Sequence, residues 1–350
     1  MKIPNIRLLN QQLSSPTFRT PKELVSWMGA IQAQDNTMMK WAVGIRLKAG
    51  NIQMVEKALH DAEILRTHVM RPTWHLVVAE DIRWMLKLSA QRLKSVYDSY
   101  AKGGGLDITE GLITKSNNLL EKELCGNKSM TKQELTELFE RSGLPSDTHH
   151  MNRFMSRAET EGIICSGEVR GRQHTYALLE ERVPPTPELT KDESLARLAT
   201  NYFRSHSPAV LQDFVWWTGL PIADAKQAIY LIESELVTEQ WNGQTWYMHN
   251  TCRTRGKISG SVCLLPPWDE YLLGYKDRTD VLPKEHYPKA FTNNGLFFPV
   301  IVSEGQIVGN WNKVTKKGGV QIEHTYFQKE TNIDEELLNQ AKLKYTKFLG

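Results

Sequence analysis

Apolar residues recur at helical spacing along much of the chain. Leu24, Met28 and Ile31 follow this spacing and predict a helix over 21–32, and a second helix is predicted over 36–48. Both segments place polar residues between the apolar ones. Such a stripe is typical of helices that pack one face against a core.

The helices are followed by pairs of short strands, and this order recurs three times. The three segments of helices and hairpin span 21–78, 131–179 and 192–249. In the last of them Asn242-Gly243 separates two strands of alternating polarity, which is the strongest short-range hairpin pattern that a sequence offers. Helices followed by a hairpin are the pattern of a winged helix, a helix-turn-helix with a β wing.

The pattern predicts an α+β protein that is mainly α, with three tandem winged-helix units and a small C-terminal antiparallel β region. A Gly-Gly-Gly run at 103–105 and a proline-rich linker at 183–188 separate the copies. We assign the chain to a first winged helix, a helical connection with a second winged helix, a third winged helix, and a β-rich region with a terminal helix. These four ranges are 1–105, 106–185, 186–258 and 259–350.

Composition narrows the class of protein. With 40% hydrophobic and 24% charged residues among 350, the chain is typical of a globular protein. No apolar run approaches the ~18 residues of a membrane span, and the N-terminus lacks a secretory apolar segment. We therefore expect a cytoplasmic protein without membrane contact. The four cysteines are scattered and show no metal-binding spacing, so we expect no metal site.

The formal net charge of +3 says little about partners, but its distribution says more. Between Ile64 and Ser95 there are six Lys and Arg residues and two acidic ones. Clustered positive charge suits a polyanion such as nucleic acid, because neutralised phosphates release counterions. The alternative is a solvated helix face. Charge alone leaves both interpretations open.

Two glutamines, Gln32 and Gln34, lie one residue apart in the apolar segment "GAIQAQ". One interpretation is a helix end at which the two amides cap backbone groups or face solvent. The other is a site that needs two neutral side chains able to donate and accept hydrogen bonds. Asp35 follows them and is a plausible N-cap for the next helix.

Four segments resemble the AlkZ-like family of winged-helix DNA glycosylases. They are "GAIQAQ", "MRPTWHLVVAEDIRWML", "DFVWWTGL" and "LLPPWDEYLLGYKDR", and they are spread over nearly the whole chain. The resemblance implies three winged-helix units in a C-shaped arrangement around DNA. It also implies excision of N7-alkylated bases and unhooking of interstrand crosslinks in double-stranded DNA. We expect a monomer without cofactor, associated with the nucleoid when bound to DNA.

The resemblance gives the two glutamines a role. Catalysis in this family is attributed to a Gln–apolar–Gln motif, here Gln32–Ala33–Gln34, and a sister group has aspartate at the last position. Asp35 lies one residue too far to be that aspartate. Alkylation at N7 makes guanine a cationic leaving group that needs no general acid. Two amides suffice to hold the water that attacks the oxocarbenium ion, one as acceptor and one for orientation.

The remaining candidates for DNA contact lie on the wings, which are the predicted β hairpins of the first and second segments. They are Arg71, Thr73, His75, Arg170 and Arg172. Arg71 and His75 suit phosphate or lesion contacts, although a histidine held by a backbone carbonyl is an equally good interpretation of His75. Both arginines of the second wing lie at its tip, where phosphates are accessible.

Asp269 is a possible second carboxylate that stabilises the cation. We favour the alternative, a capping aspartate that holds a turn of the C-terminal region. A non-catalytic winged-helix DNA-binding protein, either a regulator or a damage binder, is the alternative function. Loss of product formation when the motif glutamines are removed distinguishes the enzyme from the binder.

Overall fold

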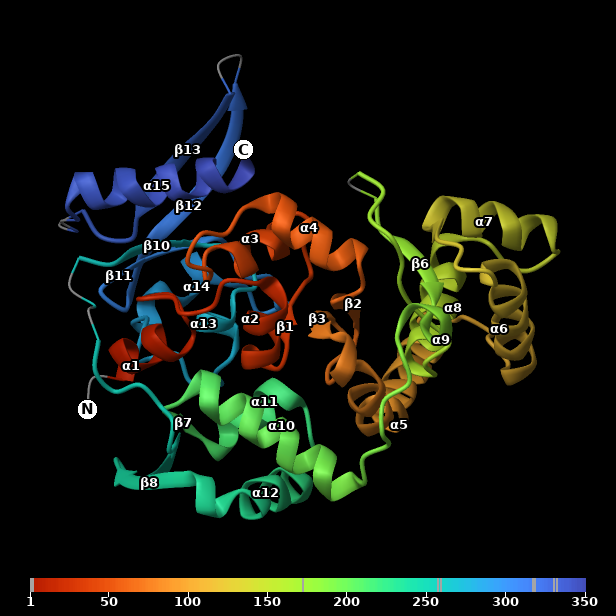
Figure 1. Cartoon of the computed structure of the whole chain (residues 1–350), viewed down its shortest axis with the longest axis horizontal. Coiled ribbons are helices and arrows are strands. Elements are labelled where there is room, and N and C mark those ends of the chain that lie inside the picture. The colour runs from red at the N-terminus through yellow and green to blue at the C-terminus, as the bar shows by residue number, and fades with distance from the viewer. Residues whose placement is uncertain are drawn as a thin grey trace. The chain divides into compact units, whose positions relative to one another are not determined.

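The computed structural model describes residues 3–171, 173–256, 258, 260–316, 319–329, 331 and 333–350. The chain forms two compact units, one from Met1–Val55 with Leu195–Gly350 and the other from Glu56–Ser194. Helices dominate both units and small antiparallel sheets accompany them (Figure 1). This confirms the predicted α+β, mainly α class.

One order of elements, helix, strand, helix, helix, strand, strand, recurs along the chain. Its first occurrence consists of α2 (Pro21–Met28), β1 (Ile31–Gln32), α3 (Met38–Gly44), α4 (Ile52–His60), β2 (Ile64–His68) and β3 (Trp74–Val78). The second consists of α6 (Glu110–Leu124), β4 (Met130–Thr131), α7 (Lys132–Arg141), α8 (Thr148–Thr160), β5 (Ile164–Ser166) and β6 (Thr175–Leu178). The third consists of α10 (Lys191–His206), β7 (Ala209–Val210), α11 (Leu211–Thr218), α12 (Ile222–Leu231), β8 (Leu236–Trp241) and β9 (Gln244–His249). The order agrees with the repeat in the sequence, except that the second copy begins with α6 at Glu110 and not at residue 131. The four assigned ranges stay a prediction.

The C-terminal region contains a four-stranded antiparallel sheet in the order β10-β11-β12-β13. Its strands are β10 (Val262–Leu265), β11 (Val300–Ser303), β12 (Gln306–Lys316) and β13 (Gly319–Tyr326). The terminal helix α15 (Glu335–Leu349) packs against it (Figure 1). Two short helices, α13 (Glu270–Leu273) and α14 (Tyr287–Ala290), lie between β10 and β11 in the sequence. The predicted small C-terminal sheet is therefore confirmed.

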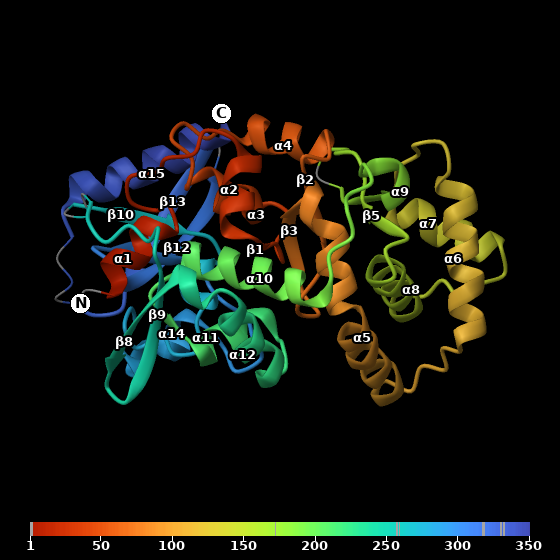
Figure 2. The same cartoon turned by 60° about the horizontal axis from the view of Figure 1, so that its bottom comes forward.

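The second unit is built around α8, which packs against α6 and the long helix α5 (Ala79–Gly103) (Figure 2). Its core includes Leu120, Phe139 and Phe154, all fully buried. The short helix α9 (Leu179–Arg182) follows β6, and α1 (Ile3–Asn10) begins the first unit. Among the described residues no helix is both long and apolar enough to cross a membrane.

The predicted hairpin in the third copy is confirmed. Strands β8 and β9 pair antiparallel up to Trp241 and Gln244. The two residues between them, Asn242 and Gly243, both have positive φ, at 49° and 71°. A two-residue turn with positive φ at both positions matches the right-handed twist of the strands, which explains the choice of asparagine and glycine.

The helix predicted over 21–32 ends earlier, at Met28. Thr20 and Glu23 form a capping box at its start, and Gly29 ends it with φ of 75°. A Cβ at Gly29 would lie 2.7 Å from Cβ of Asn201, so glycine is required there for both conformation and space. The correction matters for the site, because Gln32 lies on strand β1 and not at a helix end.

Candidate active site around Gln32 and Gln34

The segment that carries the two glutamines is fixed by burial. Ala30, Ile31 and Ala33 are inaccessible to solvent or nearly so, and their small or branched side chains pack into the first unit. Gln32 is 5% exposed, whereas Gln34 is exposed. The two amides therefore have different surroundings. Only the amide of Gln34 is open to solvent, and only this amide can be reached by a molecule that approaches from solvent.

Asp35 determines how the chain leaves the motif. Its Oδ1 accepts hydrogen bonds from the backbone N–H groups of Thr37 and Met38, at 2.8 and 2.9 Å. Its carbonyl accepts from the N–H of Met39 at the start of α3. These contacts support the capping role predicted for Asp35. They also direct its carboxylate towards its own turn.

A buried carboxylate from the other end of the chain holds the backbone of Gln32. Glu270 is fully buried at the start of α13, and its Oε1 accepts the Gln32 backbone N–H at 2.6 Å. Its Oε2 accepts Nε1–H of Trp217 at 2.9 Å. Both oxygens thus accept N–H donors, the arrangement suited to an ionised carboxylate.

The preceding residue, Asp269, fixes α13 in place. Its Oδ1 accepts the N–H of Tyr271 and caps the helix. Both carboxylate oxygens also accept from Arg46, at 2.7 and 2.8 Å, and this guanidinium is fully buried. Gln11 adds a hydrogen bond from its amide to the Glu270 carbonyl at 3.4 Å. These contacts fix the backbone from which the Glu270 side chain extends.

This geometry favours the capping interpretation of Asp269. Arg46 and the N–H of Tyr271 donate hydrogen bonds to the Asp269 carboxylate, and the residue is only 3% exposed. A carboxylate that is held in this way has no access to a sugar cation. A role of Asp269 as a second carboxylate that stabilises the cation remains a hypothesis, and this structure gives it no support.

His206 lies near the same oxygen of Glu270 as Trp217, with Nε2 3.5 Å from Oε2. Burial lowers the pKa of His206, and the hydrogen bond and charge of Glu270 only partly oppose this. The imidazole stacks on Tyr202 at 4.7 Å between ring centroids. Tyr275 donates its hydroxyl to the His206 carbonyl, at 2.9 Å. The surroundings of Glu270 are thus aromatic and tightly packed.

On the first wing, the structure brings His75 and Arg71 together. His75 is fully buried in β3, and its Nδ1 lies 2.9 Å from the Thr73 carbonyl. Because a carbonyl only accepts, Nδ1 carries the proton, and Nε2 can accept from Nη2 of Arg71 at 3.4 Å. His75 thus has the backbone-satisfied geometry that the sequence left open. Its contact with DNA stays a hypothesis, as do those of Arg71 and Thr73.

On the second wing, Arg170 is bound to its own unit. Nη1 pairs with Glu134 at 3.2 Å, and Nη2 donates to the Ser129 carbonyl at 2.6 Å. The side chain is still 46% exposed, so its outer edge is accessible. Arg172 lies outside the described residues. Phosphate contact by the two arginines stays a prediction.

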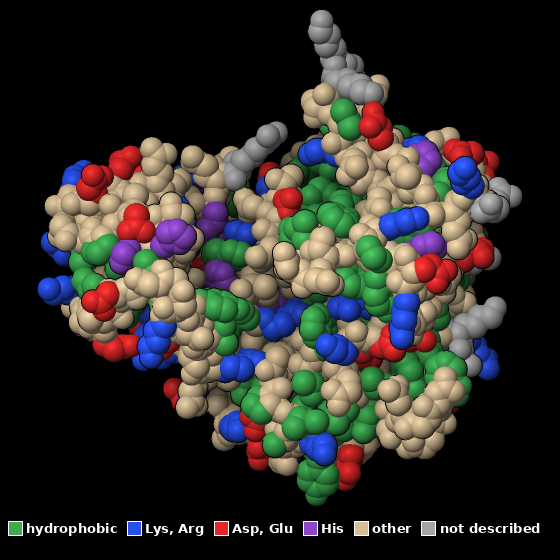
Figure 3. All heavy atoms as spheres, turned by 180° about the vertical axis from the view of Figure 1, so that it is seen from behind, with side chains coloured by type: hydrophobic (Ala, Val, Ile, Leu, Met, Phe, Trp, Pro, Cys, Tyr) green, Lys and Arg blue, Asp and Glu red, His purple; other side chains and the backbone are tan. Residues whose placement is uncertain are grey.

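The basic stretch between Ile64 and Ser95 is partly neutralised by acids from elsewhere in its unit. The pairs are Arg83 with Glu180, Lys87 with Glu188, and Lys94 with Glu110. Figure 3 likewise shows Asp and Glu side chains interspersed among Lys and Arg on the face that it displays. The cluster is therefore a weaker indication of a polyanion site than its sequence suggested.

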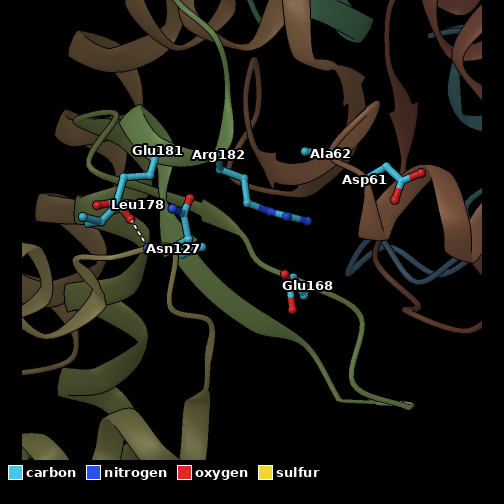
Figure 4. Close-up of a pocket in the computed structure, with 8 residues that line it drawn as sticks. Asp61, Ala62, Asn127, Glu168, Leu178, Glu181 and Arg182 are labelled. Carbon is cyan, nitrogen blue, oxygen red and sulfur yellow. Dashed lines mark hydrogen bonds between the residues drawn. The ribbon is translucent and has the colours of Figure 1, made fainter.

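A pocket of about 130 Å³ in the second unit offers no comparable site (Figure 4). Its arginine, Arg182, donates to the carbonyls of Leu59 and His60, at 3.0 and 2.7 Å. Its carboxylate Glu181 accepts the N–H groups of the turn Gly126-Asn127. Arg182 and Glu181 thus bind backbone groups of their own unit and are not free for a ligand.

Sequence reasoning missed Glu270 and its neighbours His206 and Trp217. Glu270 stands beside Asp269 in the long segment "LLPPWDEYLLGYKDR", and Trp217 lies in "DFVWWTGL". Both segments carry the family resemblance, but the roles of Glu270 and Trp217 could not be inferred from the sequence alone. The length and unusual composition of these segments were the only indication that they support a site.

Comparison with known proteins agrees with the resemblance. A curated relative, the interstrand DNA cross-link repair glycosylase of Streptomyces sahachiroi, is 22% identical over 337 residues, which is 89% of this chain and 87% of the relative. The solved structure of Streptomyces sahachiroi DNA glycosylase AlkZ matches with a TM-score of 0.78 at 19% identity, over 99% of this chain and 95% of that one. The family model described as DNA glycosylase AlkZ-like matches residues 25–344. Because this match spans most of the chain, the protein belongs to the AlkZ-like DNA glycosylase family.

Proposed function

We propose that the protein is a monofunctional DNA glycosylase for cationic alkylated bases, with a water held by Gln32 and Gln34. The main observation behind this proposal is that the two amides differ in their exposure to solvent. Gln34 is exposed, while Gln32 is buried and its backbone is held by Glu270. An exposed amide next to a fixed one suits a water that must be held in one orientation.

The chemistry explains why two neutral amides are adequate. An N7-alkylguanine leaves as a neutral base because it starts as a cation, so no proton has to be supplied to it. The sugar becomes an oxocarbenium ion, to which a held water adds and then loses a proton to solvent. Amide oxygens accept hydrogen bonds from that water and orient its lone pair, without acting as acids.

The contacts of the two nearby aspartates support a substrate range restricted to cationic bases. Asp35 accepts the N–H groups of its own turn, and Asp269 is enclosed in a buried ion pair. Neither is placed to protonate a leaving base. Uracil, hypoxanthine and 8-oxoguanine should therefore stay in DNA, while N7-alkylguanine and N3-alkyladenine are released.

The test is base release from one duplex sequence that carries each of these bases in turn, read as alkali-labile strand breaks. We expect breaks at N7-methylguanine and N3-methyladenine only. Efficient release of uracil or hypoxanthine would reveal an acid and overturn the two-amide mechanism. Tight binding to N7-methylguanine duplex without breaks would favour the non-catalytic damage binder.

We also propose interstrand-crosslinked guanines as substrates on double-stranded DNA, with the protein acting as a monomer. The name of the curated relative, an interstrand DNA cross-link repair glycosylase, supports crosslinks as substrates. Release of one strand from a crosslinked duplex on a denaturing gel tests it. Crosslinked DNA that remains intact under conditions that excise N7-methylguanine would limit the enzyme to monoadducts.

The reaction should end at the abasic site. No lysine accompanies the glutamine motif in the sequence to form a Schiff base with the sugar. Treatment of the reaction with borohydride should therefore leave protein and DNA separate. A covalent protein–DNA product would show lyase activity and contradict this part of the proposal.

A further inference from the structure

We infer that Glu270 is a positioning residue for the glutamine motif, acting on Gln32 through its backbone N–H. The inference rests on the proposed function. Its geometric basis is independent of it: a fully buried carboxylate lies 2.6 Å from the Gln32 nitrogen. That distance is short for a hydrogen bond from N–H, as expected when the acceptor is charged.

The placement of Glu270 is itself fixed. Asp269 caps helix α13, which carries Glu270. The Asp269 carboxylate accepts two hydrogen bonds from the buried guanidinium of Arg46. The second oxygen of Glu270 is held by Trp217, which lies on α11. The carboxylate therefore has little freedom to follow a moving strand, and it imposes its position on Gln32 instead.

The consequence for the site is orientation. Strand β1 is only two residues long, so few backbone bonds of its own hold it. Gln32 and Gln34 follow one another with a single residue between them, and a shift of the Gln32 peptide moves both amides. Displacement of catalytic groups by about 1 Å can reduce a rate by roughly 100-fold. Glu270 adds a direct hydrogen bond to the Gln32 peptide to the burial that already holds this segment.

The variants that test this are Glu270→Gln and, as the matched control, Trp311→Phe. In Glu270→Gln the charge that accepts the Gln32 N–H is lost in every molecule, and the new NH₂ group faces a donor, either Gln32 or Trp217. Trp311 is also fully buried in the first unit, and its indole N–H donates to the Leu265 carbonyl at 2.8 Å. Trp311→Phe therefore removes a buried hydrogen bond of the C-terminal sheet and leaves the contacts of Glu270.

We expect Glu270→Gln to lower the single-turnover excision rate roughly 100-fold at unchanged DNA affinity. Trp311→Phe should stay within a few-fold of wild type. Equal losses in Glu270→Gln and Trp311→Phe would mean that Glu270 only holds the core, which would overturn the inference.

A double-mutant cycle that combines Glu270→Gln with removal of both motif glutamines separates this inference from the proposed function. The backbone N–H at position 32 remains in Gln32→Ala and still positions Gln34, so Gln34→Ala is added. If Glu270 acts through the two amides, Glu270→Gln should have little further effect on the rate in this background, and full additivity would overturn the positioning role. If the variant without both glutamines keeps the wild-type rate, the proposed function fails, and the positioning role in catalysis fails with it.

Hydrogen exchange provides a readout that needs no activity. The amide of Gln32 should exchange slowly in the wild type and at least ten-fold faster in Glu270→Gln, while amides in the core of α10 stay protected. Unchanged protection at Gln32 would show that the contact does not form in solution. Faster exchange throughout the first unit would show a general loss of structure and also contradict a specific role.

Discussion

The ion pair between Arg46 and Asp269 is a fully buried charged contact near the motif. Both side chains are enclosed, and two short hydrogen bonds join them. A buried pair of this kind adds little net stability over an apolar pair, but loss of one partner leaves a charge without compensation. Its structural importance therefore appears only when it is broken.

We predict that Asp269→Asn lowers the free energy of unfolding by about 3–5 kcal/mol, because Arg46 stays buried opposite a neutral amide. Urea denaturation followed by tryptophan fluorescence measures it. Asp61→Asn is the control, since Asp61 pairs with Lys57 at the surface and its change should leave stability within error. Equal stability of Asp269→Asn and wild type would refute the structural role of this carboxylate.

At this scale the sequence predicted what is local. The capping role of Asp35 depends on neighbours two and three residues away, and the structure supports it. The contact of Gln32 with Glu270 joins residues 238 positions apart. No spacing rule reaches across that distance, which is why Glu270 was not identified as part of the site.

Among the elements, the β8–β9 hairpin has the most specific turn. Gly243 has φ of 71°, and a Cβ there would meet no atom within 4 Å. Substitution therefore adds backbone strain and no clash. The turn offers a clean measure of how much the left-handed conformation matters to the first unit.

We predict that Gly243→Ala destabilises the first unit by about 1 kcal/mol, since an L-residue resists positive φ. Denaturant unfolding measures the change. Gly103→Ala is the matched control: it also adds a Cβ in open space, but at the end of helix α5, where alanine is favoured. If both substitutions have the same effect, strain at the turn is not the cause.

The second wing supplies the test of DNA contact. Replacement of Arg170 and Arg172 by alanine should weaken binding to damaged and undamaged duplexes alike. The dependence of log affinity on log salt should become shallower by about two phosphate contacts. Lys122→Ala on α6, which is 80% exposed, is the control for loss of a surface charge. A change in discrimination between lesion and normal base would instead mean that the wing reads the lesion.

Element types were predicted well because each helix has its own periodicity and start. The capping box of Thr131 and Glu134 opens α7 at the start of the predicted second segment, 131–179. The error over 29–32 arose because apolar residues continue at helical spacing past Gly29. The positive φ of Gly29 ends the helix there, and Asn201, from a distant part of the chain, leaves no room for a Cβ at this position.

At the scale of the whole molecule, the first unit combines both ends of the chain, Met1–Val55 and Leu195–Gly350. The segment that carries the glutamines comes from one end, and the α13 residues that support it come from the other. Periodicity places elements along a chain but does not say which distant segments meet. The repeat of winged helices was therefore visible in sequence, whereas the support of the motif required the structure.

The central claim is that Gln34 holds the attacking water, and one measurement tests it most directly. The single-turnover excision rate of Gln34→Ala on N7-methylguanine duplex is compared with its affinity for the same DNA. We predict a rate at least 100-fold below wild type and an affinity within a few-fold of it, with Gln340→Ala, an exposed glutamine on α15, unchanged in both. Full activity of Gln34→Ala, or a loss of affinity equal to the loss of rate, would contradict the account.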